Sequence, residues 1–193
     1  MALTFDDGPG PWTESIARLL EEHGCRGTFF LLGSAVETHA DVVARLAAAG
    51  HELGNHLWSH RDPAELDVKT IRVELDRTAA AIRDVCGVTP TLVRPPYCSA
   101  PRRVARAAGR TSAELVVLRT VDPADWRATS ADDVVADVLA VAGPGDIVCL
   151  HDGVAPSNTG TPTREVTVAA VGALVPQLLE RGLRPVTVSE LLR

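Results

Sequence analysis

The sequence predicts one α/β domain organised around a parallel β-sheet. Short apolar runs alternate with segments of helical period along the whole chain, and polar side chains follow many of the apolar runs where loops would begin. The 193 residues are 46% hydrophobic, and a chain of this length buries roughly 70% of the surface that its unfolded form exposes. A core can therefore stabilise it without disulfides or structural metals. Without repeats or linkers, residues 1–193 are predicted to form a single domain.

Seven apolar runs have the length and composition of buried strands. They are Ala2–Phe5, Thr28–Leu32, His51–Asn55, Thr91–Arg94, Leu115–Val121, Asp146–Leu150 and Arg184–Val188. Strands that alternate with helices pair in parallel, with the helices outside the sheet. The pattern leaves open whether the sheet closes into a barrel or stays open and doubly wound.

Six segments between these runs carry an apolar stripe of helical period. They are Thr13–His23, Ala35–Ala49, Val68–Val85, Pro101–Ala108, Ala131–Val141 and Arg164–Arg181. Ser34 and Glu37 have the spacing of a capping box that begins the second helix, and Gly50 is typical of the residue that ends it. Because proline lacks a backbone N–H, we expect a kink or a break at Pro176 in the last helix.

Charge and composition exclude several classes of partner. Lys and Arg number 19 against 25 Asp and Glu, a net charge of −6, which leaves no basic surface for nucleic acid or anionic lipid. Apolar runs such as Leu115–Leu118 are far shorter than the ~20 residues that cross a bilayer. We therefore expect neither a nucleic-acid nor a membrane partner, and the sequence leaves the oligomeric state open.

No signal peptide precedes the first predicted strand, which begins directly after Met1. If Met1 is the true start, the protein is expected in the cytoplasm; otherwise the chain is a secreted domain whose leader has been removed. The four cysteines, Cys25, Cys86, Cys98 and Cys149, form no C-x-x-C pair. In a chain without an export signal they are expected to be free thiols.

Chemically active residue types gather at the carboxyl ends of five predicted strands, the edge where parallel α/β folds hold their ligand sites. The segments are Asp6-Asp7-Gly8-Pro9, Asn55-His56-Leu57-Trp58-Ser59-His60, Arg94-Pro95-Pro96-Tyr97, Asp122-Pro123-Ala124-Asp125-Trp126 and Cys149-Leu150-His151-Asp152. Each alone has an ordinary structural interpretation, a turn for the first and a hydrogen-bonded histidine for the last. Their joint occurrence at one end of the predicted sheet favours a catalytic site.

Three of these residues have the composition of a catalytic metal centre. Asp7, His56 and His60 offer one oxygen and two nitrogen ligands and leave positions open for water, as catalytic zinc-like sites do. Adjacent carboxylates at a strand end point in different directions, so Asp6 can stay free as a base while Asp7 binds the ion. We expect one divalent ion, Zn²⁺ first, with Co²⁺ and Ni²⁺ as alternatives.

Taken in order, the five segments resemble the motifs of polysaccharide deacetylases with the NodB-homology domain, the family-four carbohydrate esterases. The resemblance runs from residue 3 to the end of the chain and implies a distorted (β/α)₇ barrel. It also implies metal-dependent hydrolysis of an N-acetyl or O-acetyl group on a sugar, a glycan or a small N-acylated metabolite.

The resemblance further implies a role for each motif residue. Asp7, His56 and His60 are the expected metal ligands, Asp6 the general base and His151 the general acid. Arg94 is expected to hold Asp6, and Asp125 to orient and charge-tune His151. The remaining site residues are the Tyr97 backbone N–H as oxyanion donor, Trp126 as a wall of the substrate groove, and Pro96, Cys149 and Leu150 as substrate contacts.

The chain departs from the family pattern at Leu57, Cys98 and Cys149. Leu57 lacks the hydroxyl that commonly braces the loop of the histidine pair, and Cys149 replaces a leucine that usually lines the acyl pocket, so acyl specificity is open. Polymeric and small substrates are equally compatible with the sequence. Two alternatives also remain: a related amidohydrolase acting on cyclic amides or formyl groups, and an inactive glycan-binding barrel.

Overall fold

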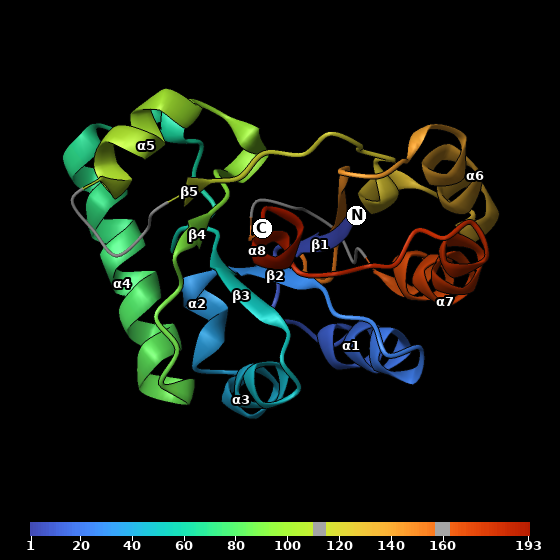
Figure 1. Cartoon of the computed structure of the whole chain (residues 1–193). Helices are drawn as coiled ribbons and strands as arrows, with labels where there is room; N and C mark the ends of the chain where they lie inside the picture. Colours follow the sequence, from blue (N-terminus) through green and yellow to red (C-terminus); the bar gives the residue numbers. More distant parts are fainter. Residues whose placement is uncertain (110–114, 157–162) are drawn as a thin grey trace.

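The computed structural model describes residues 1–109, 115–156 and 163–193. Its centre is a parallel sheet of six strands in the order β5-β4-β3-β2-β1-β6, which curls while the longer helices lie around its outside (Figure 1). The strands are β1 (Ala2–Asp6), β2 (Thr28–Leu31), β3 (Glu52–Asn55), β4 (Leu92–Val93), β5 (Leu115–Val116) and β6 (Ile147–His151). The predicted α/β class is confirmed, as a single curled sheet that forms a distorted barrel.

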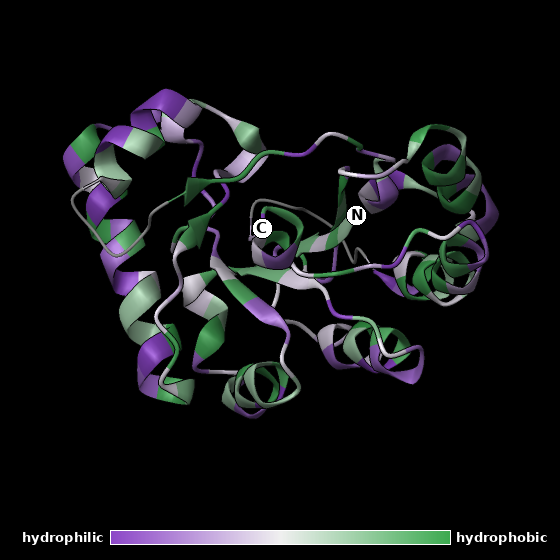
Figure 2. Cartoon of the chain, in the orientation of Figure 1, coloured by the Kyte–Doolittle hydropathy of each residue, from purple (hydrophilic) through white to green (hydrophobic). Residues whose placement is uncertain are grey.

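The helices bury one stripe each against this sheet. They are α1 (Thr13–Glu22), α2 (Gly33–Val36), α3 (Ala40–Ala48), α4 (Val68–Cys86), α5 (Pro101–Ala108), α6 (Ala131–Val141), α7 (Glu165–Glu180) and α8 (Val188–Leu191). On α1, for example, Ile16, Ala17 and Leu20 are completely buried. Figure 2 shows hydrophobic and hydrophilic residues alternating around the longer helices, the pattern that fixes which face meets the sheet.

The predicted strand over residues 115–121 forms one edge of the sheet and reaches the other. Its first residues form β5, which pairs with β4. Its last residue, Val121, makes an isolated parallel bridge to Val148 of β6, where the Cys149 N–H donates to the Val121 carbonyl at 2.9 Å. This one segment therefore spans the gap between the edge strands, and the chain that leaves it enters the site beside β6.

The predicted seventh strand, 184–188, is wrong. Val186 makes only one bridge, to Ala2, and the chain turns at once into α8, whose Thr187 and Glu190 form a capping box. The Val188 N–H donates to Thr28 Oγ1 at the start of β2. The helix thus covers the amino-terminal end of the sheet and leaves the carboxyl end to the site.

The predicted second helix, 35–49, is divided into α2 and α3, and the capping box at Ser34 and Glu37 is wrong. Ser34 lies inside α2, because the N–H groups of Gly33 and Ser34 donate to the carbonyls of Leu57 and Trp58 instead. Backbone acceptors from the β3–α4 loop replace a side-chain cap. The expected end at Gly50 is confirmed by its φ of 80°.

Helix α7 continues through Pro176, so of the two expectations the break is absent and the kink stays a prediction. Leu174, Val175 and Leu178 of the same helix are completely buried, and their burial in the core stabilises the helix despite the missing hydrogen bond. All four cysteines are free thiols, as expected. Within the described ranges, no helix combines the length and the apolar character that crossing a bilayer requires.

Candidate active site

Most of the predicted site residues line one cavity of about 320 Å³ at the carboxyl ends of the strands. Parallel pairing brings Asp6 of β1 opposite His151 of β6, and Asn55 of β3 opposite Val93 of β4, so four strand exits meet there. The described residues lining the cavity are Asp6, Asp7, His56, His60, Tyr97, Cys98, Arg119, Asp122, Trp126, Cys149, His151, Ala155 and Arg164.

Asp7, His56 and His60 form a buried group whose ligand atoms lie within 4.8 Å of one another. Asp7 Oδ1 lies 3.0 Å from His60 Nε2 and 3.5 Å from His56 Nε2, yet it has no partner in hydrogen-bond geometry and is shielded from solvent. An unsatisfied buried carboxylate oxygen is costly. A divalent ion held by Asp7, His56 and His60 would satisfy it, so these residues fit the metal that the fold family uses.

The surroundings of the group hold its ligands in place. The His56 Nδ1–H donates to the Arg94 carbonyl at 2.8 Å, which turns Nε2 toward the site, as a second-shell acceptor does for metal-binding histidines. Burial opposes ionisation of Asp7, but the two imidazoles beside it lower the pKa of this carboxyl below its usual range. Asp7 and His60 have left-handed backbone φ values of 71° and 58°, a conformation that costs free energy in non-glycine residues.

The loop that carries the histidine pair is braced by Glu74 of α4, a residue that the sequence motifs did not indicate. Its carboxylate accepts from the Ser59 hydroxyl at 2.6 Å and from the N–H groups of Trp58 and Ser59 at 3.2 Å. Leu57 is completely buried in a hydrophobic cluster. The hydroxyl that Leu57 lacks is therefore replaced by a carboxylate brace from the neighbouring helix.

Asp6 is held by the completely buried Arg94. The Arg94 Nη1–H donates to Asp6 Oδ1 at 2.8 Å and to Thr4 Oγ1 at 2.7 Å. Burial alone raises the pKa of Asp6, but the Arg94 guanidinium and then His56 lower it below the ordinary value. Asp6 is therefore ionised at neutral pH, and its second oxygen, Oδ2, faces the cavity.

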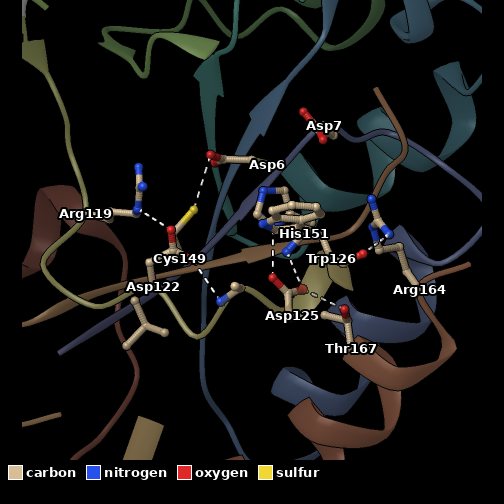
Figure 3. Close-up of polar contacts among 12 residues, drawn as sticks. Asp6, Asp7, Arg119, Asp122, Asp125, Trp126, Cys149, His151, Arg164 and Thr167 are labelled. Carbon is tan, nitrogen blue, oxygen red and sulfur yellow. Dashed lines mark hydrogen bonds and ion pairs between the residues drawn. The ribbon is translucent and has the colours of Figure 1, made fainter. Parts of the chain in front are cut away.

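His151 is oriented by Asp125 (Figure 3). Its ring Nδ1 lies 2.8 Å from Asp125 Oδ1, and its backbone N–H donates to Oδ2 at 2.9 Å. The Thr167 hydroxyl of α7 also donates to Oδ2, at 2.6 Å. Burial disfavours the imidazolium, but the Asp125 carboxylate outweighs it and raises the pKa of His151 to about 9. At neutral pH the His151 ring is therefore the imidazolium, with a proton on both nitrogens.

The remaining predicted contacts divide between the cavity and the core. Tyr97 and Trp126 are half exposed, at 55% and 49%, and both line the cavity, as does Cys149. Pro96 and Leu150 are buried and do not line it in the described part of the chain. Leu150 belongs to the core because successive strand residues point to opposite faces. The expected substrate contacts of Pro96 and Leu150 are therefore corrected.

Two arginines line the cavity that the sequence motifs did not indicate. Arg119 Nε pairs with Asp122 Oδ2 at 2.7 Å. Arg164 is 1% exposed; its Nε donates to the Gly153 carbonyl at 2.8 Å, which ties the start of α7 to the loop after β6. In the sequence each looks like an ordinary surface arginine beside a polar loop, because only the tertiary fold brings them to the cavity.

Two glycines allow the exits of β1 and β6 to pack tightly together. A Cβ built at Gly8 would overlap the Asp152 carboxylate, and one at Gly153 would overlap the Asp7 carbonyl. Asp152 in turn accepts from the Thr13 hydroxyl. Any side chain at either position would push apart the loops that carry Asp7 and His151.

A buried two-histidine, one-carboxylate group, flanked by an ionised carboxylate and a protonated imidazole, defines a metal-dependent hydrolase site. Residues 1–116 match the family model described as polysaccharide deacetylase. The chain is 36% identical over 186 residues to a chitooligosaccharide deacetylase from Bradyrhizobium, covering 93% of this chain and 84% of that protein. The chain belongs to the polysaccharide deacetylase family, whose members depend on a metal ion and hydrolyse acetyl groups.

Further similarities extend over nearly the whole chain. A peptidoglycan-N-acetylglucosamine deacetylase from Bacillus cereus is 33% identical over 188 residues, which are 97% of this chain and 66% of that protein. The solved structure of peptidoglycan deacetylase PdaC from Bacillus subtilis superposes with a TM-score of 0.87 at 33% identity, covering 99% of this chain and 88% of that one. The α/β fold predicted from the resemblance is therefore the fold of this chain, as a curled half-barrel of six strands rather than seven.

Proposed function

We propose that this chain hydrolyses the N-acetyl group of an amino sugar unit in an oligosaccharide or glycan. The observation that carries the proposal is the pairing of Asp6 with Arg94 and of His151 with Asp125. Asp6 and His151 line the same cavity as the candidate metal ligands Asp7, His56 and His60. One pair supplies a base and the other an acid. Relatives named as chitooligosaccharide and peptidoglycan-N-acetylglucosamine deacetylases support the substrate class.

The proposed reaction begins with attack of water on the acetyl carbonyl. Asp7, His56 and His60 would hold a divalent ion, which would polarise the carbonyl and lower the pKa of the attacking water. Asp6 Oδ2 accepts the proton of the attacking water, and the hydrogen bond from Arg94 to Oδ1 keeps this carboxylate ionised and fixes its orientation. The Tyr97 backbone N–H donates to the oxyanion that develops on the carbonyl oxygen.

Collapse of the tetrahedral species breaks the carbon–nitrogen bond. An amine leaves poorly unless its nitrogen is protonated, and the His151 Nε2–H supplies that proton. The products are acetate and a free amino sugar. Asp125 holds the ring at Nδ1, so only Nε2 is presented to the substrate.

Two further hollows, each lined in part by one of the residues Asp7 and His60, support a substrate longer than one sugar. One, of about 430 Å³, is lined in part by His60 and Tyr97. Another, of about 510 Å³, is lined in part by Asp7 and Trp12. Aromatic side chains offer apolar faces on which sugar rings can stack. The proposal therefore favours oligosaccharides over a small N-acylated metabolite.

The direct test is release of acetate from N-acetylglucosamine oligomers by metal-loaded protein. We expect turnover with oligomers and a much lower kcat/KM with the monosaccharide. The inactive-barrel alternative predicts binding without acetate release, and the amidohydrolase alternative predicts turnover of cyclic amides or formamides instead. The family comparisons do not favour either alternative.

The cytoplasmic location predicted for a chain starting at Met1 stays a prediction, which cell fractionation tests.

Metal content provides the first mutational prediction. The purified protein is expected to hold about one tightly bound divalent ion, zinc before cobalt or nickel. His60→Ala removes a ligand, so metal and activity should be lost together, as measured by elemental analysis and acetate release. The exposed His23 provides a matched control, since His23→Ala should keep both. A metal-free yet fully active His60→Ala variant would contradict the ligand assignment.

Acyl specificity provides a second prediction. Cys149 lines the cavity with its sulfur beside Asp6, so Cys149→Leu is expected to narrow the space for the acyl group. One methylene in such a pocket changes discrimination by about 1–3 kcal/mol. We expect the ratio of kcat/KM for N-propionyl over N-acetyl substrate to fall in Cys149→Leu and not in Cys86→Leu on α4. An unchanged ratio would remove Cys149 from the specificity of the enzyme.

The pH dependence of activity provides a third prediction. Activity requires Asp6 ionised and His151 protonated, so it falls at low pH as Asp6 gains a proton and at high pH as His151 loses one. Because Asp125 raises the pKa of His151 to about 9, Asp125→Asn should move the alkaline limb of kcat/KM to lower pH. An alkaline limb that stays in place in Asp125→Asn would show that another group titrates there.

A further inference from the structure

A second group of metal-ligating side chains lies in the same cavity and shares no residue with the first. Ligand atoms of Asp6, Cys149 and His151 lie within 4.8 Å of one another. Register explains the meeting: Asp6 pairs with His151 across β1 and β6, and Cys149 precedes His151 by two residues, on the same face of β6. Figure 3 shows the Cys149 sulfur pointing to Asp6.

Each of the three side chains has one ligand atom left for an ion. Asp6 and His151 each use their other polar atom in a hydrogen bond, and Cys149 has only its sulfur. Asp6 Oδ1 is held by Arg94 at 2.8 Å, which leaves Oδ2, and Cys149 Sγ lies 3.4 Å from that oxygen. His151 Nδ1 is held by Asp125 at 2.8 Å, which leaves Nε2. A carboxylate behind the imidazole fixes the tautomer and raises ligand basicity, as in most histidine–zinc sites.

The one ligand–ligand distance that is measured suits a tetrahedral ion, and all three atoms lie within 4.8 Å of one another. Zinc binds sulfur at about 2.3 Å and oxygen or nitrogen at about 2.0–2.2 Å. At those bond lengths, tetrahedral geometry places ligand atoms about 3.3–3.7 Å apart. The measured sulfur–oxygen distance of 3.4 Å already lies in that range. The set of one thiolate, one carboxylate and one imidazole leaves a fourth position for water.

Charges of both signs surround the sulfur. Asp6 Oδ2 lies 3.4 Å from Cys149 Sγ, and Arg94 holds the other oxygen of Asp6 at 2.8 Å. Asp122 and Arg119 line the same cavity. The thiolate is the form of cysteine that binds metal ions, so an ion at this place would take the position of the thiol proton.

We propose that Asp6, Cys149 and His151 form an inhibitory site for a second, thiophilic divalent ion such as Zn²⁺. On binding, the Cys149 thiol and the Nε2–H of the His151 imidazolium each release a proton to solvent, and the thiolate, the Asp6 carboxylate and the freed His151 Nε2 donate electron pairs to the ion without any change of oxidation state. The inhibition rests on the proposed function, because the ion occupies the base and the acid of that reaction.

The binding site itself is tested by cobalt spectroscopy on metal-stripped protein. A second equivalent of Co²⁺ should produce a near-ultraviolet sulfur-to-cobalt charge-transfer band in the wild type. Cys149→Ser should lose the band, whereas Cys98→Ser, which changes another thiol of the same cavity, should keep it. A band that survives in Cys149→Ser, or binding of a single ion by the wild type at saturating Co²⁺, would overturn the proposal.

Two further measurements separate this proposal from the proposed function. In His60→Ala the charge-transfer band should persist, because that residue belongs only to the first group. Excess Zn²⁺ should inhibit acetate release, and the concentration for half inhibition, relative to each variant's own activity, should rise at least about tenfold in Cys149→Ser. Loss of zinc inhibition only in Cys98→Ser would contradict the site, whereas a protein without deacetylase activity but with the Cys149-dependent band would contradict only the function.

Discussion

Asp6→Asn is expected to lower kcat for acetate release by about 10²–10⁴-fold, the range for loss of a general base, while the protein keeps its divalent ion. The reason is geometric: Arg94 holds Oδ1 of Asp6, and the metal group is formed by the adjacent Asp7 with the histidine pair. An amide at position 6 can still accept from Arg94 but cannot accept a proton from water at neutral pH. Steady-state kinetics and metal analysis of the same sample measure both effects.

Asp7→Asn is the matched variant for this experiment. It should weaken metal binding itself, so that activity returns in part when excess metal is added, whereas Asp6→Asn should not respond to added metal. Thermal unfolding of both variants checks that the buried Arg94, deprived of its counter-charge in Asp6→Asn, has not unfolded the protein. Identical metal affinities and identical kinetic losses in the two variants would show that the adjacent carboxylates have been given the wrong roles.

His151→Ala is expected to reduce amide hydrolysis far more than hydrolysis of an activated aryl ester. An amine needs a proton to leave and an aryl alcohol does not, so only the amide depends on the acid. The expected loss is about 10²–10⁴-fold on the amide. The measurement compares kcat/KM for an N-acetyl sugar and an aryl acetate in the same preparation.

The exposed His23 again provides the control, since His23→Ala should leave both substrates unaffected. Because His151→Ala leaves the Asp125 carboxylate without its imidazole partner, a His151→Gln variant, which keeps a side chain beside Asp125, should show the same selective loss. Equal losses on the amide and the ester would argue against a general acid at His151.

The residues of the candidate site were predictable because their signals are local in sequence. Each motif stands where an apolar run ends, and parallel strands place such ends at one edge of a sheet. Asp7, His56 and His60 do meet there, and His151 does lie beside Asp125. Their catalytic roles stay predictions that the variants above test.

Two of the errors of prediction share one cause, which is that distant backbone and side chains compete with local preferences, and the error at Leu150 has a local cause. The capping box at Ser34 failed because carbonyls of the loop after β3 satisfy the same N–H groups. The last strand failed because α8, capped by Thr187, takes over after a single bridge. Leu150 was given a substrate contact because it is adjacent to His151, although strand alternation turns it to the core.

The sequence alone determined the α/β class, the resemblance to the family and the identity of the metal-binding and acid–base candidates, since hydrophobic period and short motifs are encoded over a few residues. The tertiary structure decided what depends on contacts between distant segments. It brought Glu74 beneath the histidine loop, Thr167 and Arg164 behind the Asp125 turn, and Cys149 against Asp6. Such contacts leave no periodic or motif signal, because they are fixed only when the curled sheet brings separate strand ends within a few ångströms of one another.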